Sequence, residues 1–286
     1  MALRFEDVTQ DGRVVLEALP NALEPTVWQR LRNTEPATSA CIARGIIPVL
    51  TRFVLEGAPG PFSPHQPVEA LATWRLARTD AGPIVLDMWA ELFAPIGNVY
   101  GPPPDHAGER ALLGRVYAEH VFTRPFAPPG QRRVTGFDFE GAPPVPETRP
   151  ALAPAEALAR VPDGARAIEP ALRLDPVPVV FGLVHTDSNR HVNSLAYLRA
   201  FEEAALRRFV DLGRPALLLG RRLTIAYRKP CFAGQVLRVA LQAFEHQDRL
   251  GAAGLLIEAA DAASEALDPE SMRRRARATM QIELET

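Results

Sequence analysis

The sequence predicts an α+β protein in which one order of elements occurs twice. Three observations support this prediction: segments with period-two alternation follow one another across short turns, a single strong helix-like stretch precedes them in each half, and a proline-rich stretch separates the halves. Successive alternating strands with short connections favour antiparallel sheets. A length of 286 residues fits two domains of roughly 150 residues each. Because one helix covers only one face of a sheet, we expect the two halves to pack against each other.

The first half is expected to contain one helix and several strands. Val14–Glu17 fits a short strand, and apolar residues at three- and four-residue spacings predict a helix over 36–56. Pro48 should kink or split that helix. Period-two alternation then predicts three strands, at 68–76, 84–92 and 112–122.

The proline-rich stretch between the halves is expected to be a linker. Proline lacks the amide donor that a central strand needs, and eight prolines lie between Pro125 and Pro154. We place the linker at 128–168, with a short helix at 155–160 inside it. The first unit then covers 1–127 and the second covers 169–286.

The second half repeats the order of the first. A strand-like stretch at 172–184 contains prolines, which suit an edge strand or an irregular start. A strong helix is expected over 194–212, with an apolar stripe that includes Leu198, Phe201 and Phe209. Further strands are expected at 222–228, 235–244, 255–259 and 273–284.

Composition excludes several classes of protein. With 47% hydrophobic and 23% charged residues, the chain can bury a sizeable core, and it contains no apolar run near the ~20 residues of a membrane span. A net charge of −2 argues against a nucleic-acid partner. Its two cysteines are too few for a disulfide scaffold, and no histidines and cysteines stand at metal-ligand spacing. We therefore expect no metal and no cofactor. The first residues become acidic before any apolar region develops, so we expect no signal peptide, and a cytoplasmic location fits best.

The sharpest local pattern lies between a strand and the strong helix, at 184–194. Asp187, Asn189 and His191 stand at alternate positions, and Asn193 or Ser194 can cap the helix. Such a string could merely shape a loop. However, the free amides of a helix N-terminus can polarise a carbonyl oxygen, and a nearby carboxylate can act as general base or nucleophile. The pattern therefore has the parts for acyl transfer.

These residues also resemble a known family. The run Asp187–Asn193, followed by Tyr197-Leu198 and Glu202-Glu203, is similar to the signature of the hot-dog-fold thioesterases, above all the acyl-acyl-carrier-protein (acyl-ACP) thioesterases. The resemblance implies two hot-dog units in one chain, each an antiparallel sheet wrapped around a long helix. It also implies hydrolysis of fatty or related acyl thioesters, with Asp187 as the catalytic carboxylate and Asn189 and His191 as its partners. Helix amides near Asn193 and Ser194 would hold the oxyanion. An acyl carrier protein or coenzyme A would carry the acyl group, and a homodimer is an option.

One departure from the family pattern concerns a second segment. Tyr227–Cys231 resembles a family run that ends in a glutamate–cysteine pair, but Pro230 stands where the glutamate would be. Either Asp187 works without it, or Glu202 or Glu203 compensates, or activity is weak. Cys231 is a weaker candidate nucleophile, because most lone cysteines are small buried hydrophobic residues. The first half has no D-x-N-x-H counterpart, so we expect one active site per chain.

Two rival functions remain at this point. A hot-dog hydratase is disfavoured, because such enzymes carry a motif like D-x-N-P-x-H, and the proline is missing here. The dehydratase pattern H-F-P-x-x-P is missing as well. A non-catalytic acyl-binding protein is the other rival, and Pro230 is the best argument for it. Thiol release from acyl thioesters separates an enzyme from a binder.

Overall fold

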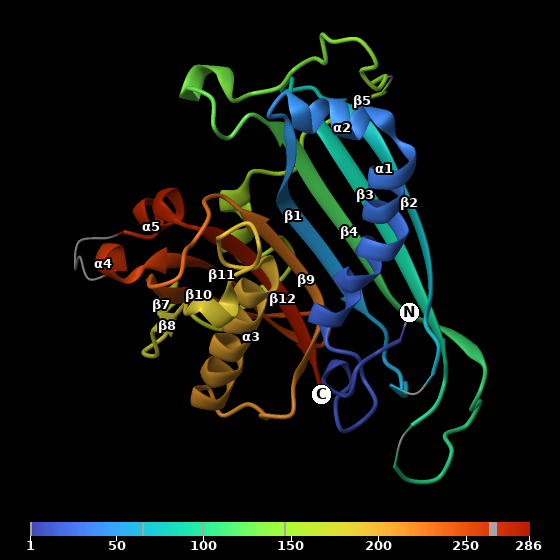
Figure 1. Ribbon diagram of the computed structural model, residues 1–286. Helices are drawn as coiled ribbons and strands as arrows, with labels where there is room; N and C mark the ends of the chain where they lie inside the picture. Colours follow the sequence, from blue (N-terminus) through green and yellow to red (C-terminus); the bar gives the residue numbers. More distant parts are fainter. Residues whose placement is uncertain (1, 65, 99, 146, 263–267) are drawn as a thin grey trace. The chain divides into compact units, whose positions relative to one another are not determined.

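The chain forms two compact units, Met1–Leu152 and Ala153–Thr286 (Figure 1). The structure is a computed structural model, which describes residues 2–64, 66–98, 100–145, 147–262 and 268–286. Each unit consists of one sheet with a helical segment packed on it. The boundary between the units falls in the proline-rich stretch. The fold class is α+β, as the sequence predicts.

The sheet of the first unit has the strand order β5-β2-β3-β4-β1. Its four long strands pair antiparallel, and the short β5 pairs parallel with β2. β5 comes from the stretch that the sequence analysis treats as a linker. The strands are β1 (Ile47–Gly57), β2 (Glu69–Thr79), β3 (Ile84–Pro95), β4 (Arg110–Thr123) and β5 (Glu147–Arg149).

The helical segment of the first unit lies earlier than the sequence predicts. It passes through a 3₁₀ turn η2 (Leu16–Ala22), a π turn η3 (Glu24–Trp28), and the helices α1 (Gln29–Thr34) and α2 (Pro36–Ala43). The predicted helix over 36–56 is therefore wrong beyond residue 43, since β1 begins at Ile47. The strand expected at 14–17 is wrong too: Val14 makes only an isolated bridge with Val8. Two further 3₁₀ turns are η1 (Phe5–Asp7) and η4 (Pro129–Gln131).

A heptad-like apolar pattern explains why this earlier segment is helical. Five apolar residues recur at spacings of three and four residues, and all five are buried: Leu16, Leu19, Leu23, Val27 and Leu31. Pro20 lies inside η2 and Pro25 at the start of η3. Because proline removes amide donors, the backbone takes 3₁₀ and π geometry here instead of one continuous α-helix.

A buried histidine gives the first unit an acid-sensitive core. His120, on β4, meets the ring of Trp28 edge to face at 5.0 Å, and burial lowers its pKa from 6.5 to about 3. Within the described residues its Nδ1 has no hydrogen-bond partner. A folded-state pKa below the unfolded one means that the neutral ring stabilises the fold fully above about pH 6.5, and that this stability is lost as the pH falls toward 3.

We therefore expect the free energy of unfolding of His120→Phe to fall less with decreasing pH than that of the wild-type protein. Chemical unfolding followed by tryptophan fluorescence at pH 7 and pH 4 measures this, since Trp28 reports on the same core. The wild-type protein should lose more stability between the two pH values than the variant, at up to about 1.4 kcal/mol per unit of pKa difference. Any destabilisation caused by the bulkier phenylalanine ring is the same at both pH values, so it cancels when the change between pH 7 and pH 4 is compared. Equal losses in both proteins would exclude His120 as the sensitive group.

The sheet of the second unit has the order β9-β12-β11-β10-β6, and two short strands, β7 and β8, also pair with β10. All of these pairs are antiparallel. The helix α3 (Ser194–Asp211) packs on β10, β11 and β12 through the buried stripe that the sequence predicts. The strands are β6 (Arg166–Ala167), β7 (Arg173–Leu174), β8 (Val179–Val180), β9 (Leu219–Tyr227), β10 (Val236–His246), β11 (Arg249–Glu258) and β12 (Ala278–Glu285).

Two expectations for the second unit need correction. The stretch at 172–184 forms only the two-residue strands β7 and β8, because Pro176 and Pro178 interrupt it. The last strand starts at Ala278 and not at Arg273, because the residues before it form the helix α5 (Pro269–Arg275). Asp268 caps α5 by accepting the amide of Ser271 at 2.8 Å, and the arginines of its last turn suit the helix dipole.

The remaining short helices of the second unit are η5 (Ala155–Ala159), η6 (Leu183–His185) and α4 (Ala259–Ala262). η5 matches the short helix expected at 155–160. It packs on β12, where the hydroxyl of Thr279 donates to the carbonyl of Ala155 at 2.6 Å. Thr279 is therefore buried, although its place in the alternation predicts an outward side chain. Across the described ranges, the structure has no helix with the length and apolar character needed to cross a membrane.

Candidate active site

The D-x-N-x-H string forms a tight hairpin-like loop directly before α3. Thr186 and Val192 make an antiparallel bridge, and the amide of Asp187 donates to the carbonyl of His191 at 3.1 Å. Inside the loop, the amide of Arg190 donates to the carbonyl of Asp187 at 3.0 Å, and Arg190 takes a left-handed φ of 66°. Residues that face each other across such a ladder project their side chains to the same side. The spacing of the motif therefore places Asp187 and His191 together.

The side chains of Asp187 and His191 confirm that placement. Oδ1 of Asp187 lies 3.9 Å from Nδ1 of His191, and the same oxygen accepts the amide of Asn189 at 2.8 Å. The carboxylate is partly buried and the imidazole is more open. Asn189 joins this group through its backbone, while the residue as a whole is exposed. The two titratable groups are close enough to contact one bound molecule together.

The N-terminus of α3 follows the loop after a single residue. Asn193 caps the helix: its side chain accepts the amide of Leu195 at 2.9 Å, and its own amide donates to the carbonyl of His185 at 2.8 Å. The side-chain oxygen and the backbone amide of Asn193 are thus used inside the protein. The amide of Ser194, the first of the helix, has no hydrogen-bond partner within the described part of the chain. Ser194 therefore offers the amide that a ligand could use.

The segment around Cys231 supports the loop from its other side. The carbonyl of Cys231 accepts the amide of Val192 at 2.8 Å, and the amide of Cys231 donates to Oη of Tyr197 at 2.9 Å. Oη of Tyr227 donates to the carbonyl of Ser194 at 3.0 Å. Both tyrosines belong to the runs that resemble the family, but the sequence pattern predicts no role for either of them. Their role could have been predicted from one rule: a tyrosine on a buried face needs a hydrogen-bond partner for its hydroxyl.

The environment of Cys231 argues against a thiolate nucleophile. The residue is 0% exposed, and burial raises the pKa of its thiol although Tyr197 and Arg277 oppose the shift. A reactive cysteine needs a lowered pKa and access to the substrate. Cys231 therefore has the properties of a packing residue.

We expect Cys231→Ser to release thiol from acyl thioesters at a rate close to that of the wild-type protein. A serine hydroxyl can still fill this buried position beside Tyr197, and its backbone bonds to the loop are unchanged. Steady-state thiol release and the rate of iodoacetamide labelling of the folded protein measure this. Rapid inactivation by iodoacetamide that substrate blocks, and that the serine variant lacks, would move the chemistry onto the cysteine.

The glutamates proposed as substitutes for the missing family glutamate lie more than two turns along α3 from Ser194. Glu202 accepts the amide of Gly220 at 2.8 Å, and Glu203 is exposed beside Arg207 at 4.0 Å. Glu202 lies eight positions after Ser194, which at 1.5 Å per residue places it about 12 Å along the helix. Pro230 is exposed. Among the described residues, Asp187 is therefore the residue of the loop that provides a carboxylate for the candidate site.

Within the described ranges, no group of three or more His, Cys, Asp or Glu residues has the arrangement of a metal site. His65, one of the scattered histidines of the sequence, lies outside the described residues.

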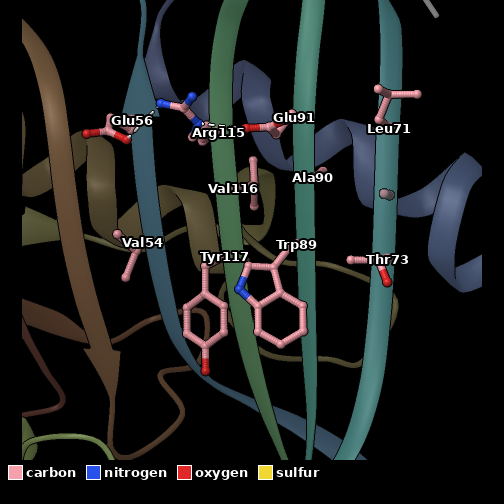
Figure 2. A pocket seen from close by; sticks show the side chains of 11 residues that line it. Val54, Glu56, Leu71, Thr73, Trp89, Ala90, Glu91, Arg115, Val116 and Tyr117 are labelled. Atoms are coloured by element: carbon pink, nitrogen blue, oxygen red, sulfur yellow. Dashed lines mark hydrogen bonds and ion pairs between the residues drawn. The ribbon is translucent and has the colours of Figure 1, made fainter.

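A groove of about 530 Å³ lies on the sheet of the first unit and contains none of the candidate site residues. Figure 2 shows Trp89 and Tyr117 side by side on neighbouring strands, with their ring centroids 5.5 Å apart. The two carboxylates of the groove flank Arg115, with Glu91 at 2.9 Å and Glu56 at 3.9 Å. Because both carboxylates are paired with this guanidinium, the groove offers less to acid–base chemistry than the loop does. It is lined by Val54, Glu56, Leu71, Ala72, Thr73, Trp89, Ala90, Glu91, Arg115, Val116 and Tyr117.

Comparison with known proteins shows the fold. No protein-family model matches the chain, and no curated protein matches its sequence. Among solved structures, it is similar over its whole length to a protein described as an oleoyl thioesterase from Lactobacillus plantarum, with a TM-score of 0.62, 15% identity and 94% of that chain covered. A 12:0-ACP thioesterase from Umbellularia californica gives a TM-score of 0.61 at 16% identity, with 100% of this chain and 92% of that one covered. An acyl-ACP thioesterase from Bacteroides thetaiotaomicron gives 0.57 at 12% identity, with 100% and 96% covered. The chain has the double hot-dog fold of these proteins.

Proposed function

From the double hot-dog fold, we propose that the chain hydrolyses acyl thioesters in the loop formed by Thr186–Ser194. The observation that carries the proposal is the pairing of the Asp187 carboxylate with the His191 imidazole, 3.9 Å apart, directly before the N-terminus of α3. A base, an orienting group and an amide donor are the parts that acyl transfer needs. The solved structures with the same fold, described as oleoyl and acyl-ACP thioesterases, support the substrate class.

The proposed reaction proceeds by addition to the thioester carbonyl. Asp187 takes a proton from water, and the water oxygen bonds to the carbonyl carbon. The amide of Ser194 stabilises the negative charge that develops on the carbonyl oxygen. The carbon–sulfur bond then breaks, and the proton held by Asp187 returns to the thiolate, so that a carboxylic acid and a thiol leave. His191 orients the attacking water against Asp187.

A second route uses Asp187 itself as the nucleophile. Its carboxylate oxygen would bond to the carbonyl carbon and expel the thiolate, and water would then hydrolyse the resulting anhydride. Both routes need the same carboxylate. Neither needs a glutamate at position 230, and this is how we reconcile the family resemblance with Pro230.

Three finer assignments belong to the same proposal. An acyl carrier protein is the preferred carrier, because two of the similar structures are described as acting on acyl-ACP. The acyl chain would lie in apolar space between helix and sheet. We place the enzyme in the cytoplasm, and its state of association, monomer or homodimer, is open to direct measurement.

Thiol release from a panel of acyl thioesters tests this function. Medium- and long-chain acyl groups, linked either to coenzyme A or to acyl carrier protein, are offered to the wild-type protein. Saturable release of free thiol together with free fatty acid is the expected result. Tight binding without turnover would assign the chain to the non-catalytic acyl binders. Addition of water to an enoyl thioester with the thioester intact would assign it to the hydratases.

A further inference from the structure

Several large apolar side chains stand open to solvent beside the candidate active site. Among those beside the site, Leu183 and Val184 are the most exposed, at 81% and 91%. A contiguous exposed apolar patch that borders a site commonly marks an interaction surface. We call this patch the apolar rim; it consists of Val177, Val180, Leu183, Val184, Phe232 and Val236.

Strand pairing brings the two parts of the apolar rim together. Val180 on β8 is the register partner of Val236 on β10. The amide of Phe181 donates to the carbonyl of Gln235 at 3.1 Å, and the amide of Gly234 donates to the carbonyl of Phe181 at 2.7 Å. Figure 1 shows β7 and β8 beside β10 in the second unit. Val180 and Val236 are therefore neighbours, and the two segments that carry the rim residues are joined by backbone hydrogen bonds.

The outward direction of Leu183 and Val184 is fixed by the turn that carries them. The preceding Phe181 is buried, and its ring packs against those of Tyr197 and His185. Nδ1 of His185 accepts the amide of Gly182 at 2.9 Å, which closes the 3₁₀ turn η6. The turn leads directly into Thr186 and the candidate loop, so the rim forms one border of the site.

The exposed charges beside the apolar rim are positive; of the two flanking carboxylates, Asp175 is buried against Arg207 and Asp187 is partly buried. Residues 176–186 and 228–237 contain no Asp or Glu, although the whole chain has 34 of them and a net charge of −2. Arg190 and Lys229 are exposed next to these stretches, and Lys229 is the only lysine of the chain. The Arg228 guanidinium, in contrast, is paired with Glu156 at 2.8 Å. An apolar surface flanked by unshared positive charge suits an anionic partner.

We propose that the apolar rim docks on the surface of a lipid bilayer that contains anionic lipids. Leu183 and Val184 would enter the boundary between headgroups and acyl chains, and Arg190 and Lys229 would contact lipid phosphates. A convex turn with two almost fully exposed apolar tips fits a fluid bilayer, which closes around it, better than a rigid protein partner, which would need a matching cavity. The proposal goes beyond thioester hydrolysis and does not depend on it.

Vesicle flotation tests this proposal with protein and lipid alone. Wild-type protein should float with vesicles of three parts phosphatidylcholine to one part phosphatidylglycerol, and much less with pure phosphatidylcholine. The double variant Leu183→Ser/Val184→Ser should bind the anionic vesicles at least about tenfold more weakly, because it loses the side chains that would leave water. Lys229→Gln should weaken binding to anionic vesicles only. Leu217→Ser is the matched control, since Leu217 is similarly open, at 71%, but lies outside the rim.

Three results would overturn the assignment. The first is wild-type protein that floats with neither kind of vesicle. The second is a double variant that floats as well as the wild type. The third is a double variant that loses binding to an acyl carrier protein while its vesicle binding is unchanged, which would assign the rim to a protein partner. Circular dichroism of each variant shows whether the protein is folded, so loss of fold is not mistaken for loss of docking.

Discussion

Replacing Asp187 by asparagine is expected to lower kcat for thioester hydrolysis at least ~100-fold, the usual minimum for a general base. The amide oxygen of asparagine can still accept the amide of Asn189, so the loop keeps its geometry. The variant loses only the negative charge and the ability to take a proton. Stopped-time measurement of thiol and fatty acid release gives kcat, and KM should change little because the shape of the site is preserved.

Glu203→Gln is the matched control for Asp187→Asn. It removes one carboxylate from the same segment, and Glu203 is exposed on α3, away from the loop. Its kcat should stay close to that of the wild type. Retention of more than about a tenth of wild-type turnover by Asp187→Asn would show that another residue is the base.

The second large effect is expected for His191→Ala, with a loss of roughly 10²-fold in kcat. The imidazole is the group nearest to Asp187 on the open side of the loop, and its removal leaves the attacking water without a second contact. His246→Ala serves as control, because His246 lies on β10 and pairs with Glu283 at 3.0 Å. Full activity in His191→Ala together with lost activity in Cys231→Ser would reverse the roles that we assign to these two residues.

The sequence predicts the second unit better than the first, and the reason is local. The helix at 194–212 has an uninterrupted apolar stripe, which predicts a helix, and an asparagine cap, which predicts where that helix starts. In the first unit, Pro20 and Pro25 hide a helical stripe, whereas Val49, Leu50 and Phe53 fit a helical and a strand spacing alike. This stretch forms β1 because it pairs with β4, and the local period of apolar residues does not predict such long-range pairing.

The candidate site shows the same division between local and long-range information. The juxtaposition of Asp187 and His191 follows from a five-residue hairpin, so it depends only on residues close together in the chain. The support by Tyr197 depends on its contact with Cys231, 34 positions away in the chain, and no local pattern predicts it. The suggestion that Glu202 or Glu203 replaces the family glutamate stays a prediction, although both lie more than two turns along α3 from Ser194.

We propose that acyl thioesters bind and react at the loop formed by residues 186–194. A crystal structure with an acyl-pantetheine ketone, in which a methylene group replaces the thioester sulfur, shows where the substrate binds. We expect the ketone oxygen within hydrogen-bond distance of the Ser194 amide, and the carbonyl carbon facing Asp187 and His191. An analogue bound instead in the groove beside Trp89 and Tyr117, with the loop empty, would show that the reaction site lies elsewhere.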